Sequence, residues 1–112
     1  MRTFKDVMDR AGRLIEEHRA QASSAGAVYK FVLEGEGGGT FVLNLTDTPG
    51  VMEGDGAADC TMRMTIDDFV DMAEGRMDSR ELFFQGRLLV DGDMGLALKL
   101  KKLRDSVGMP EL

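Results

Sequence analysis

The order of elements between residues 58 and 100 constrains the fold of this chain more than any other feature of its sequence. Apolar side chains alternate over 58–64, as in a half-buried strand, and then recur at three- and four-residue spacing, as in a helix. The pattern predicts a strand, a capped helix, a glycine stop, a second short helix, a strand and a final apolar helix. A sheet with one apolar face needs a cover, and these helices provide it.

The first half of the chain predicts a helix followed by three strands. Residues 3–21 carry a single apolar stripe, which indicates an amphipathic helix capped by Thr3. Residues 27–34 and 40–46 alternate on either side of a glycine-rich turn, which predicts a hairpin, and residues 51–53 predict a short third strand. We therefore expect an α+β fold with the order α-β-β-β-β-α-α-β-α. The long helical connection before the last strand favours a mixed sheet.

Capping residues set the expected helix boundaries in the second half. Thr65 is placed to cap the first of these helices, and Gly75 to end it. Asp78 is placed to cap the next helix. Residues 87–91 then predict the fifth strand, with Leu88 and Val90 on one face.

Length, charge and cysteine content limit the classes of protein to which this chain can belong. The chain of 112 residues is expected to form a single domain over 1–112. Its formal net charge of −6 argues against nucleic-acid binding, which needs a concentrated basic surface. We expect no membrane span, because no apolar run reaches about 18 residues, and no signal peptide. Cys60 is the single cysteine, so no internal disulfide forms and a reducing, cytoplasmic location is expected.

Methionine is frequent relative to the aromatic residues. The sequence has nine methionines against six phenylalanines and one tyrosine, and it has no tryptophan. The flexible thioether side chain adapts its shape, which suits a cavity that accepts varied ligands. Filling irregular gaps in an ordinary core explains the same composition equally well. Composition alone therefore leaves an adaptable cavity and a packed core as equal alternatives.

No group of residues has the pattern of a catalytic or metal site. His18 is expected at the edge of a helix stripe, and Cys60 is expected to be a small buried hydrophobe. Asp67 and Asp68 stand in the first turn of a helix, where carboxylates interact favourably with the helix dipole. The glycine-rich run 35–39 lacks the Lys-Ser or Lys-Thr that follows a phosphate-binding loop. We therefore expect no enzyme activity, no metal and no cofactor.

The last predicted helix, over 93–107, combines an apolar stripe with a basic cluster. The cluster consists of Lys99, Lys101, Lys102 and Arg104, on a chain that is acidic overall. One interpretation is a solvated basic face on a helix packed against the core. The other is a surface for membrane docking, which makes transient contact with an anionic membrane.

Several short motifs in the second half resemble a known family. They read Ala-Asp-Cys-Thr, Met-Thr-Ile-Asp-Asp-Phe, Glu-Gly-Arg-Met-Asp, Phe-Phe-Gln-Gly-Arg-Leu and Asp-Gly-Asp-Met-Gly-Leu-Ala-Leu-Lys-Leu. In this order the chain resembles the sterol carrier protein type-2 domain, also called the nonspecific lipid-transfer domain, over nearly its full length. The resemblance implies a five-stranded mixed sheet covered by helices, with an apolar tunnel between them. It also implies noncatalytic lipid binding and transport of fatty acids, fatty acyl-CoA, phospholipids or sterols.

Two features depart from that family's pattern. The family often carries tryptophan in its second strand, where the nearest aromatic residue of this chain is Phe41. The sequence ends in Met-Pro-Glu-Leu, which is not a peroxisomal address. We therefore expect a stand-alone cytosolic carrier, and sterol itself is left open as a ligand.

A carrier of this kind holds its ligand by burying an apolar chain, which contributes at best about 0.8 kcal/mol per methylene group. The expected ligand-binding residues come from the inward strand faces and the apolar helix faces: Phe31, Leu33, Phe41, Leu43, Met62, Phe69, Met72, Phe83, Leu88, Leu96 and Leu100. A second hypothesis is an accessory or dimerisation module that binds a partner protein through its apolar face. The sequence leaves the oligomeric state open, a homodimer included.

Overall fold

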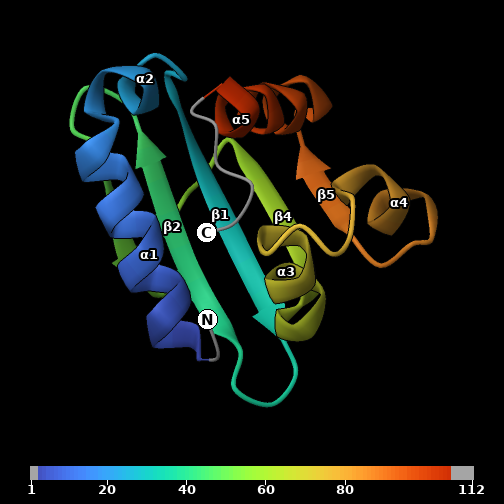
Figure 1. The fold of residues 1–112 in the computed structure, drawn as a ribbon. Helices are drawn as coiled ribbons and strands as arrows, with labels where there is room; N and C mark the ends of the chain where they lie inside the picture. The colour runs from blue at the N-terminus through green and yellow to red at the C-terminus, as the bar shows by residue number, and fades with distance from the viewer. Residues whose placement is uncertain (1–2, 107–112) are drawn as a thin grey trace.

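The computed structural model describes residues 3–106, and its elements follow the predicted order with one added helix (Figure 1). The first half contains α1 Phe4–Glu17, α2 Arg19–Ser23, β1 Ala27–Glu34, β2 Gly39–Leu45 and β3 Gly50–Glu53. The second half contains β4 Cys60–Thr65, α3 Ile66–Ala73, α4 Ser79–Phe84, β5 Leu89–Gly92 and α5 Met94–Ser106. Residue 107, the predicted end of the last helix, lies outside the described residues.

The strands form one mixed sheet in the order β3-β2-β1-β4-β5, which confirms the predicted α+β fold. β1 and β4 are parallel, and the other neighbouring strands are antiparallel. The register places Phe31 of β1 opposite Phe41 of β2 and, on its other side, opposite Met62 of β4. The helical connection joins β4 to β5, which are antiparallel, so the sequence predicted a mixed sheet from the wrong pair of strands. A long connection permits either direction of the next strand.

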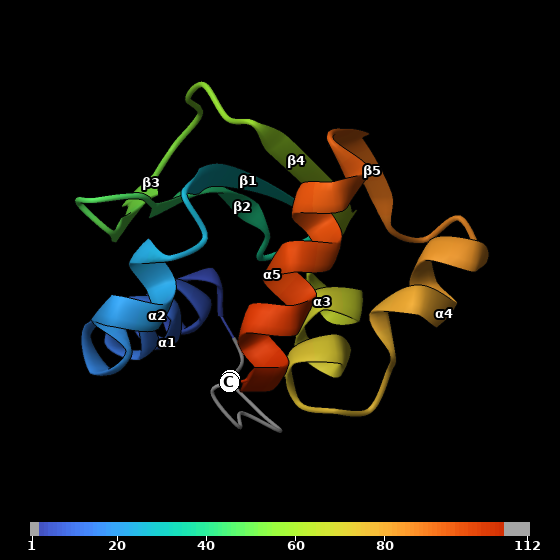
Figure 2. The ribbon, with the colours of Figure 1, turned by 90° about the horizontal axis from the view of Figure 1, so that it is seen from above.

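The helices cover one face of the sheet. Figure 2 shows α1, α2, α3 and α5 on the same side of the strands, with α4 lying outward of β5. The strand residues that point toward this helical layer are buried in the alternation that the sequence predicts: Tyr29, Phe31, Leu33, Cys60, Met62 and Met64. The predicted cover of one apolar sheet face by helices is therefore confirmed.

The N-terminal helix differs from its prediction because it is interrupted at His18. The single helix predicted over 3–21 is α1 followed by α2, and His18 between them has φ −126° and ψ 44°, outside the helical region. The expected Thr3 cap is present and forms part of a capping box. After the turn, Ala22 of α2 is only 5% exposed. This packing against the core is a tertiary contact, which local residue spacing does not reveal.

The segment before β5 also differs locally from its prediction. The strand predicted over 87–91 begins at Leu89. The backbone N–H groups of Arg87 and Leu88 donate to the carbonyl of Leu82 in α4 and so belong to the turn that ends that helix. The alternating pattern continues through both residues, so the sequence alone places the start of the strand too early.

Candidate functional site

An apolar cavity of about 430 Å³ lies between the sheet and the helices. Residues of β1, β2, β4 and β5 line it on one side, and residues of all five described helices line it on the other. Protein interiors are close-packed, so an unfilled space of this size marks a candidate binding site. The volume also falls within the range of about 300–1,000 Å³ that is usual for ligand sites.

Three phenylalanines form a rigid part of the cavity wall. The rings of Phe31 and Phe41 are stacked, with centroids 5.1 Å apart and 11° between their planes. The ring of Phe69, from α3, meets Phe31 edge-on at a centroid distance of 5.7 Å. All three side chains are buried, and each ring pair contributes about 0.5–1.5 kcal/mol beyond simple burial. The cluster therefore gives the cavity a fixed aromatic surface that does not depend on a ligand.

Most of the residues expected to contact a ligand lie on this wall: Phe31, Phe41, Leu43, Met62, Phe69, Met72, Phe83, Leu88 and Leu100. Leu33 is not on the wall, because it pairs with Gly39 at the end of β1, where the Phe4 ring of α1 packs against the strands. Leu96 also lies off the wall and packs against the core. Contact of the wall residues with a ligand stays a prediction.

Sequence reasoning missed the contribution of α1. Ala11, Leu14, Ile15 and His18 line the cavity from this helix. Amphipathic spacing identifies the buried side of a helix, but a packed core and a cavity wall present the same apolar stripe. The other wall residues that were not predicted as ligand contacts are Ala22, Leu45, Met64, Ser79, Arg80, Phe84, Val90, Met94, Ala97, Leu98, Lys101, Leu103 and Arg104.

The cavity reaches the surface between α4 and α5. Phe83 and Phe84 of α4 and Met94 and Leu98 of α5 line the cavity and are also exposed. Phe84 is 83% exposed and Leu98 is 52% exposed, which is unusual for such large apolar side chains. The four residues form an apolar rim, and this rim continues into the cavity. We refer to this opening as the mouth.

The basic residues of α5 divide into two groups. Lys101 and Arg104 lie on the cavity wall, together with Arg80 of α4. Lys99 and Lys102 are exposed and lie off the wall. Residues one or two positions apart point to different sides of a helix, whereas residues three apart share a side. The four residues predicted to dock on a membrane therefore do not form one continuous face.

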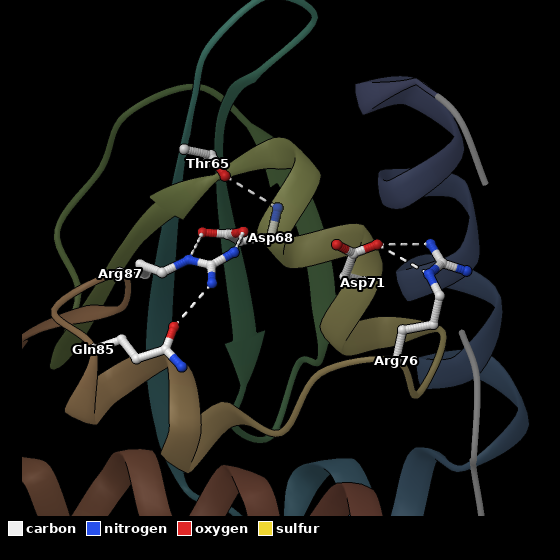
Figure 3. A network of polar contacts seen from close by, with 6 residues as sticks. All are labelled: Thr65, Asp68, Asp71, Arg76, Gln85 and Arg87. Atoms are coloured by element: carbon white, nitrogen blue, oxygen red, sulfur yellow. Dashed lines mark hydrogen bonds and ion pairs between the residues drawn. The ribbon is translucent and has the colours of Figure 1, made fainter.

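An ion pair fixes the position of two wall residues (Figure 3). The guanidinium of Arg87 donates two hydrogen bonds to the carboxylate of Asp68, one of them from Nε at 3.2 Å. Arg87 also donates to the side-chain oxygen of Gln85 at 2.9 Å. Asp68 is only 7% exposed. The helix dipole expected to stabilise its carboxylate does not by itself explain this burial, and Arg87 supplies the opposite charge. Phe69 and Leu88 directly follow the two paired residues, and the ion pair thus holds both against the cavity.

Two buried groups with reactive side chains lie outside the cavity wall. Tyr29 and Cys60 are direct partners on β1 and β4. Burial is the main cause that raises the pKa of Tyr29 to about 12, and Cys60 and nearby carboxylates add to it. Burial likewise raises the pKa of the Cys60 thiol. Both groups are protonated at neutral pH, and a protonated thiol is a poor nucleophile, so their environment fits a structural role.

Within residues 3–106, no three His, Cys, Asp or Glu side chains converge to hold a metal ion. Over the same residues, no helix has the length and hydropathy needed to cross a bilayer. The candidate site in this range is the apolar cavity, with three cations on its wall.

Sequence comparison places these features in a known family. The profile of the SCP-2 sterol transfer family matches residues 8–105. The chain belongs to this family. Hydroxysteroid dehydrogenase-like protein 2 of Pongo abelii is 43% identical to it over 84 residues, covering 72% of this chain and 20% of that relative. The matched region thus spans about a fifth of the relative's length.

Solved structures of sterol carrier proteins share the fold. Sterol carrier protein domain 2 of Helicoverpa armigera matches with a TM-score of 0.77 at 27% identity, covering 90% of this chain and 84% of that one. Sterol carrier protein 2 of Aedes aegypti, in complex with palmitate, matches with a TM-score of 0.58 at 28% identity, covering 68% of this chain and 70% of that one. The resemblance predicted from the sequence motifs is therefore confirmed.

Proposed function

We propose that this chain is a noncatalytic carrier that binds apolar lipids in the cavity and transfers them. The observation that carries the proposal is the cavity of about 430 Å³, which is lined mainly by aliphatic, methionine and aromatic side chains and opens between α4 and α5. Membership of the SCP-2 sterol transfer family and the palmitate complex of the Aedes aegypti relative support it. In this proposal the cavity is the tunnel that the resemblance implied.

The size of the cavity limits the ligand. A methylene group occupies about as much space as a water molecule in the liquid, ~30 Å³, so the cavity holds a chain on the order of a dozen carbons. Fatty acids, fatty acyl-CoA, phospholipids and sterol-like lipids all offer an apolar portion of this scale. Four flexible side chains adapt the wall to such differences in shape: Met62, Met64, Met72 and Met94.

We also propose that Lys99 and Lys102 bring the mouth to an anionic membrane. Both are exposed on α5, while other residues of the same helix line the cavity. Each basic residue near such a surface contributes about 1 kcal/mol, and salt screens this attraction. In this arrangement a lipid passes between the bilayer and the cavity over the apolar rim.

Filling the cavity tests the carrier proposal. Ala97 lines the cavity from α5, and Ala97→Trp places a large ring in the space that a ligand needs. Ala20 is exposed on α2 and lies off the wall, so Ala20→Trp is the matched control. After removal of copurified lipid, the wild type and the control should bind a fluorescent fatty acid with a Kd in the micromolar range or tighter, roughly −8 kcal/mol. Ala97→Trp should bind at least tenfold more weakly.

Two outcomes contradict the carrier proposal. One is the absence of saturable binding when the wild type is titrated with fatty acid, acyl-CoA and sterol probes. The other is equal affinity of the two tryptophan variants, which places the bound lipid outside the cavity.

A second candidate function is a module that binds a partner protein through its apolar face. The exposed rim at the mouth favours this candidate, because apolar side chains as exposed as Phe84 often mark interaction sites. Sedimentation equilibrium separates the two functions when the partner is a second copy. A mass that rises with concentration and is restored to that of a monomer by Phe84→Ser supports the interaction module.

A further inference from the structure

We infer that Arg80, Lys101 and Arg104 form a subsite for the anionic head group of a single-chain amphiphile. The inference rests on the proposed lipid binding and adds the charge of the ligand and its direction in the cavity. The polar side chains on the wall are these three cations together with His18 and Ser79, and no aspartate or glutamate of the described residues lines it. An apolar cavity with cations on its wall is complementary to an apolar chain that ends in an anion.

The cations gather where the start of α4 lies beside the second half of α5. Arg80 is the second residue of α4, and Lys101 and Arg104 are three positions apart on α5, so they share a side of that helix. The pKa of Asp78, the cap of α4, is lowered chiefly by a hydrogen bond from the Arg80 backbone, and the charges of Arg80 and Lys101 add to it. Lys101 is therefore close enough to this end of α4 to act on the same carboxylate.

The carboxylates that Arg80 and Lys101 contact hold them only weakly. The nearest oxygen of Asp78 is 3.5 Å from the Arg80 guanidinium, and Asp105 is 3.2 Å from the Lys101 ammonium. Each pair has one well-exposed member, Arg80 at 70% and Asp105 at 66%, and solvent-accessible ion pairs contribute about 0–1 kcal/mol. A ligand carboxylate or phosphate can therefore share or displace these partners at little cost.

Arg104 has unused hydrogen-bonding capacity. It donates to the Met72 carbonyl at the end of α3 at 2.8 Å, and within residues 3–106 no carboxylate pairs with it. A guanidinium carries five N–H donors, so most of them are free for another acceptor. Hydrogen bonds between ionised groups are roughly twice as strong as neutral ones. A bound anion would therefore supply the acceptor that this part of the wall lacks.

The orientation of the ligand follows from this placement. The head group lies beside the three cations on the wall, and the chain runs inward to Phe31 and Phe69. A neutral ligand of the same length gains the burial of its chain but offers no charge to Arg104 and leaves Arg80 and Lys101 with only Asp78 and Asp105. The subsite therefore discriminates by charge, whereas the rest of the cavity discriminates only by shape.

Matched ligands and matched variants test the inference. Calorimetric titration at pH 7.5 compares dodecanoate, dodecyl phosphate and 1-dodecanol, which share one chain. Arg80→Gln/Lys101→Gln removes two charges from the subsite. The control Arg19→Gln/Arg63→Gln removes two exposed charges that pair with Glu16 and Glu34 and lie off the wall.

The wild type and the control should bind dodecanoate at least tenfold more tightly than dodecanol. In Arg80→Gln/Lys101→Gln this preference should fall below threefold, because the affinity for dodecanoate falls more than the affinity for dodecanol. The titration with dodecyl phosphate identifies the preferred head group. Tighter binding of dodecyl phosphate than of dodecanoate would assign the subsite to phosphate. The preference of the wild type for the acid should also shrink as salt rises, because salt screens attraction between charges.

The outcomes separate this inference from the proposed function. Equal binding of acid and alcohol by the wild type overturns the head-group subsite and leaves the lipid carrier standing. Failure of all three probes to bind overturns both. An acid preference that survives in Arg80→Gln/Lys101→Gln also overturns the subsite. If that variant does not fold, titrations of the wild type at rising salt decide the question. A ratio of dodecanoate to dodecanol affinity that stays constant with salt contradicts the inference.

Discussion

At the residue scale, two polar contacts of buried side chains join elements from positions off the cavity wall. The Tyr29 hydroxyl donates to the Leu96 carbonyl at 2.8 Å, which connects β1 to α5. The pair of Asp68 and Arg87 connects α3 to the turn before β5. A hydrogen bond of this kind adds about 0.5–1.5 kcal/mol to stability, and more where the groups are charged. These contacts fix the wall without placing polar atoms on it.

Tyr29→Phe tests the connection between the sheet and α5. The ring is retained but the Leu96 carbonyl loses its donor, so the free energy of unfolding at pH 7 should fall by about 1 kcal/mol. The pKa of Tyr29 is raised from its ordinary value of 10 to about 12 in the folded protein. Its protonated form therefore contributes stability that is complete below pH 10 and is lost as the pH rises through 12.

Urea unfolding of both proteins from pH 8 to 12 measures this effect. Because other groups titrate in the same range, the pH dependence of Tyr29→Phe stability measures their contribution. The wild type should lose more stability than the variant above pH 10. Stability curves that stay parallel over the whole range would show that the Tyr29 hydroxyl is not held as described.

At the element scale, most helices and strands could be predicted because their residue spacing matches their environment. The alternation in β1 and β4 and the Thr65 cap of α3 all appear as expected. The break at His18 and the start of β5 could not be predicted, since both depend on contacts with distant residues or on a neighbouring turn. Local periodicity carries no signal for either kind of contact.

The wall of the cavity was predictable only in part, for a related reason. Alternation showed that Phe31 and Leu33 share the inward face of β1, but not where along the strand the cavity ends. The same limit applies to α5, where Leu100 lies on the wall and Leu96 does not. Spacing identifies a buried face, and only the packing of the other elements decides which part of that face is left unfilled.

The exposed basic residues of α5 carry a prediction for membrane contact. Lys99→Gln/Lys102→Gln should reduce the preference for lipid uptake from anionic over neutral vesicles, because each exposed charge near the surface contributes about 1 kcal/mol. Affinity for lipid presented without vesicles should stay unchanged. Stopped-flow transfer of a fluorescent fatty acid measures the preference, with Arg19→Gln/Arg63→Gln as a control of equal net charge. A full anionic preference in Lys99→Gln/Lys102→Gln would show that these residues are merely solvated.

At the scale of the whole molecule, a single sheet is covered by helices on one face (Figure 2). An apolar cavity of about 430 Å³ lies between the two layers. The ion pair of Asp68 and Arg87 and the cluster of Phe31, Phe41 and Phe69 connect the elements that form the wall of this space. The cavity opens beside the short α4, whose Phe83 and Phe84 line it and are exposed. The account therefore depends on one claim, that the chain of a bound lipid lies inside this space.

Intermolecular nuclear Overhauser effects (NOEs) test that claim most directly. Dodecanoate uniformly labelled with ¹³C is added to the unlabelled protein, and isotope-filtered spectra select contacts between ligand and protein protons. The account predicts contacts from the mid-chain methylene groups to the ring protons of Phe31 and Phe69, which face the cavity. Saturable binding with contacts to the exposed ring of Phe84, and none to either buried ring, would contradict it.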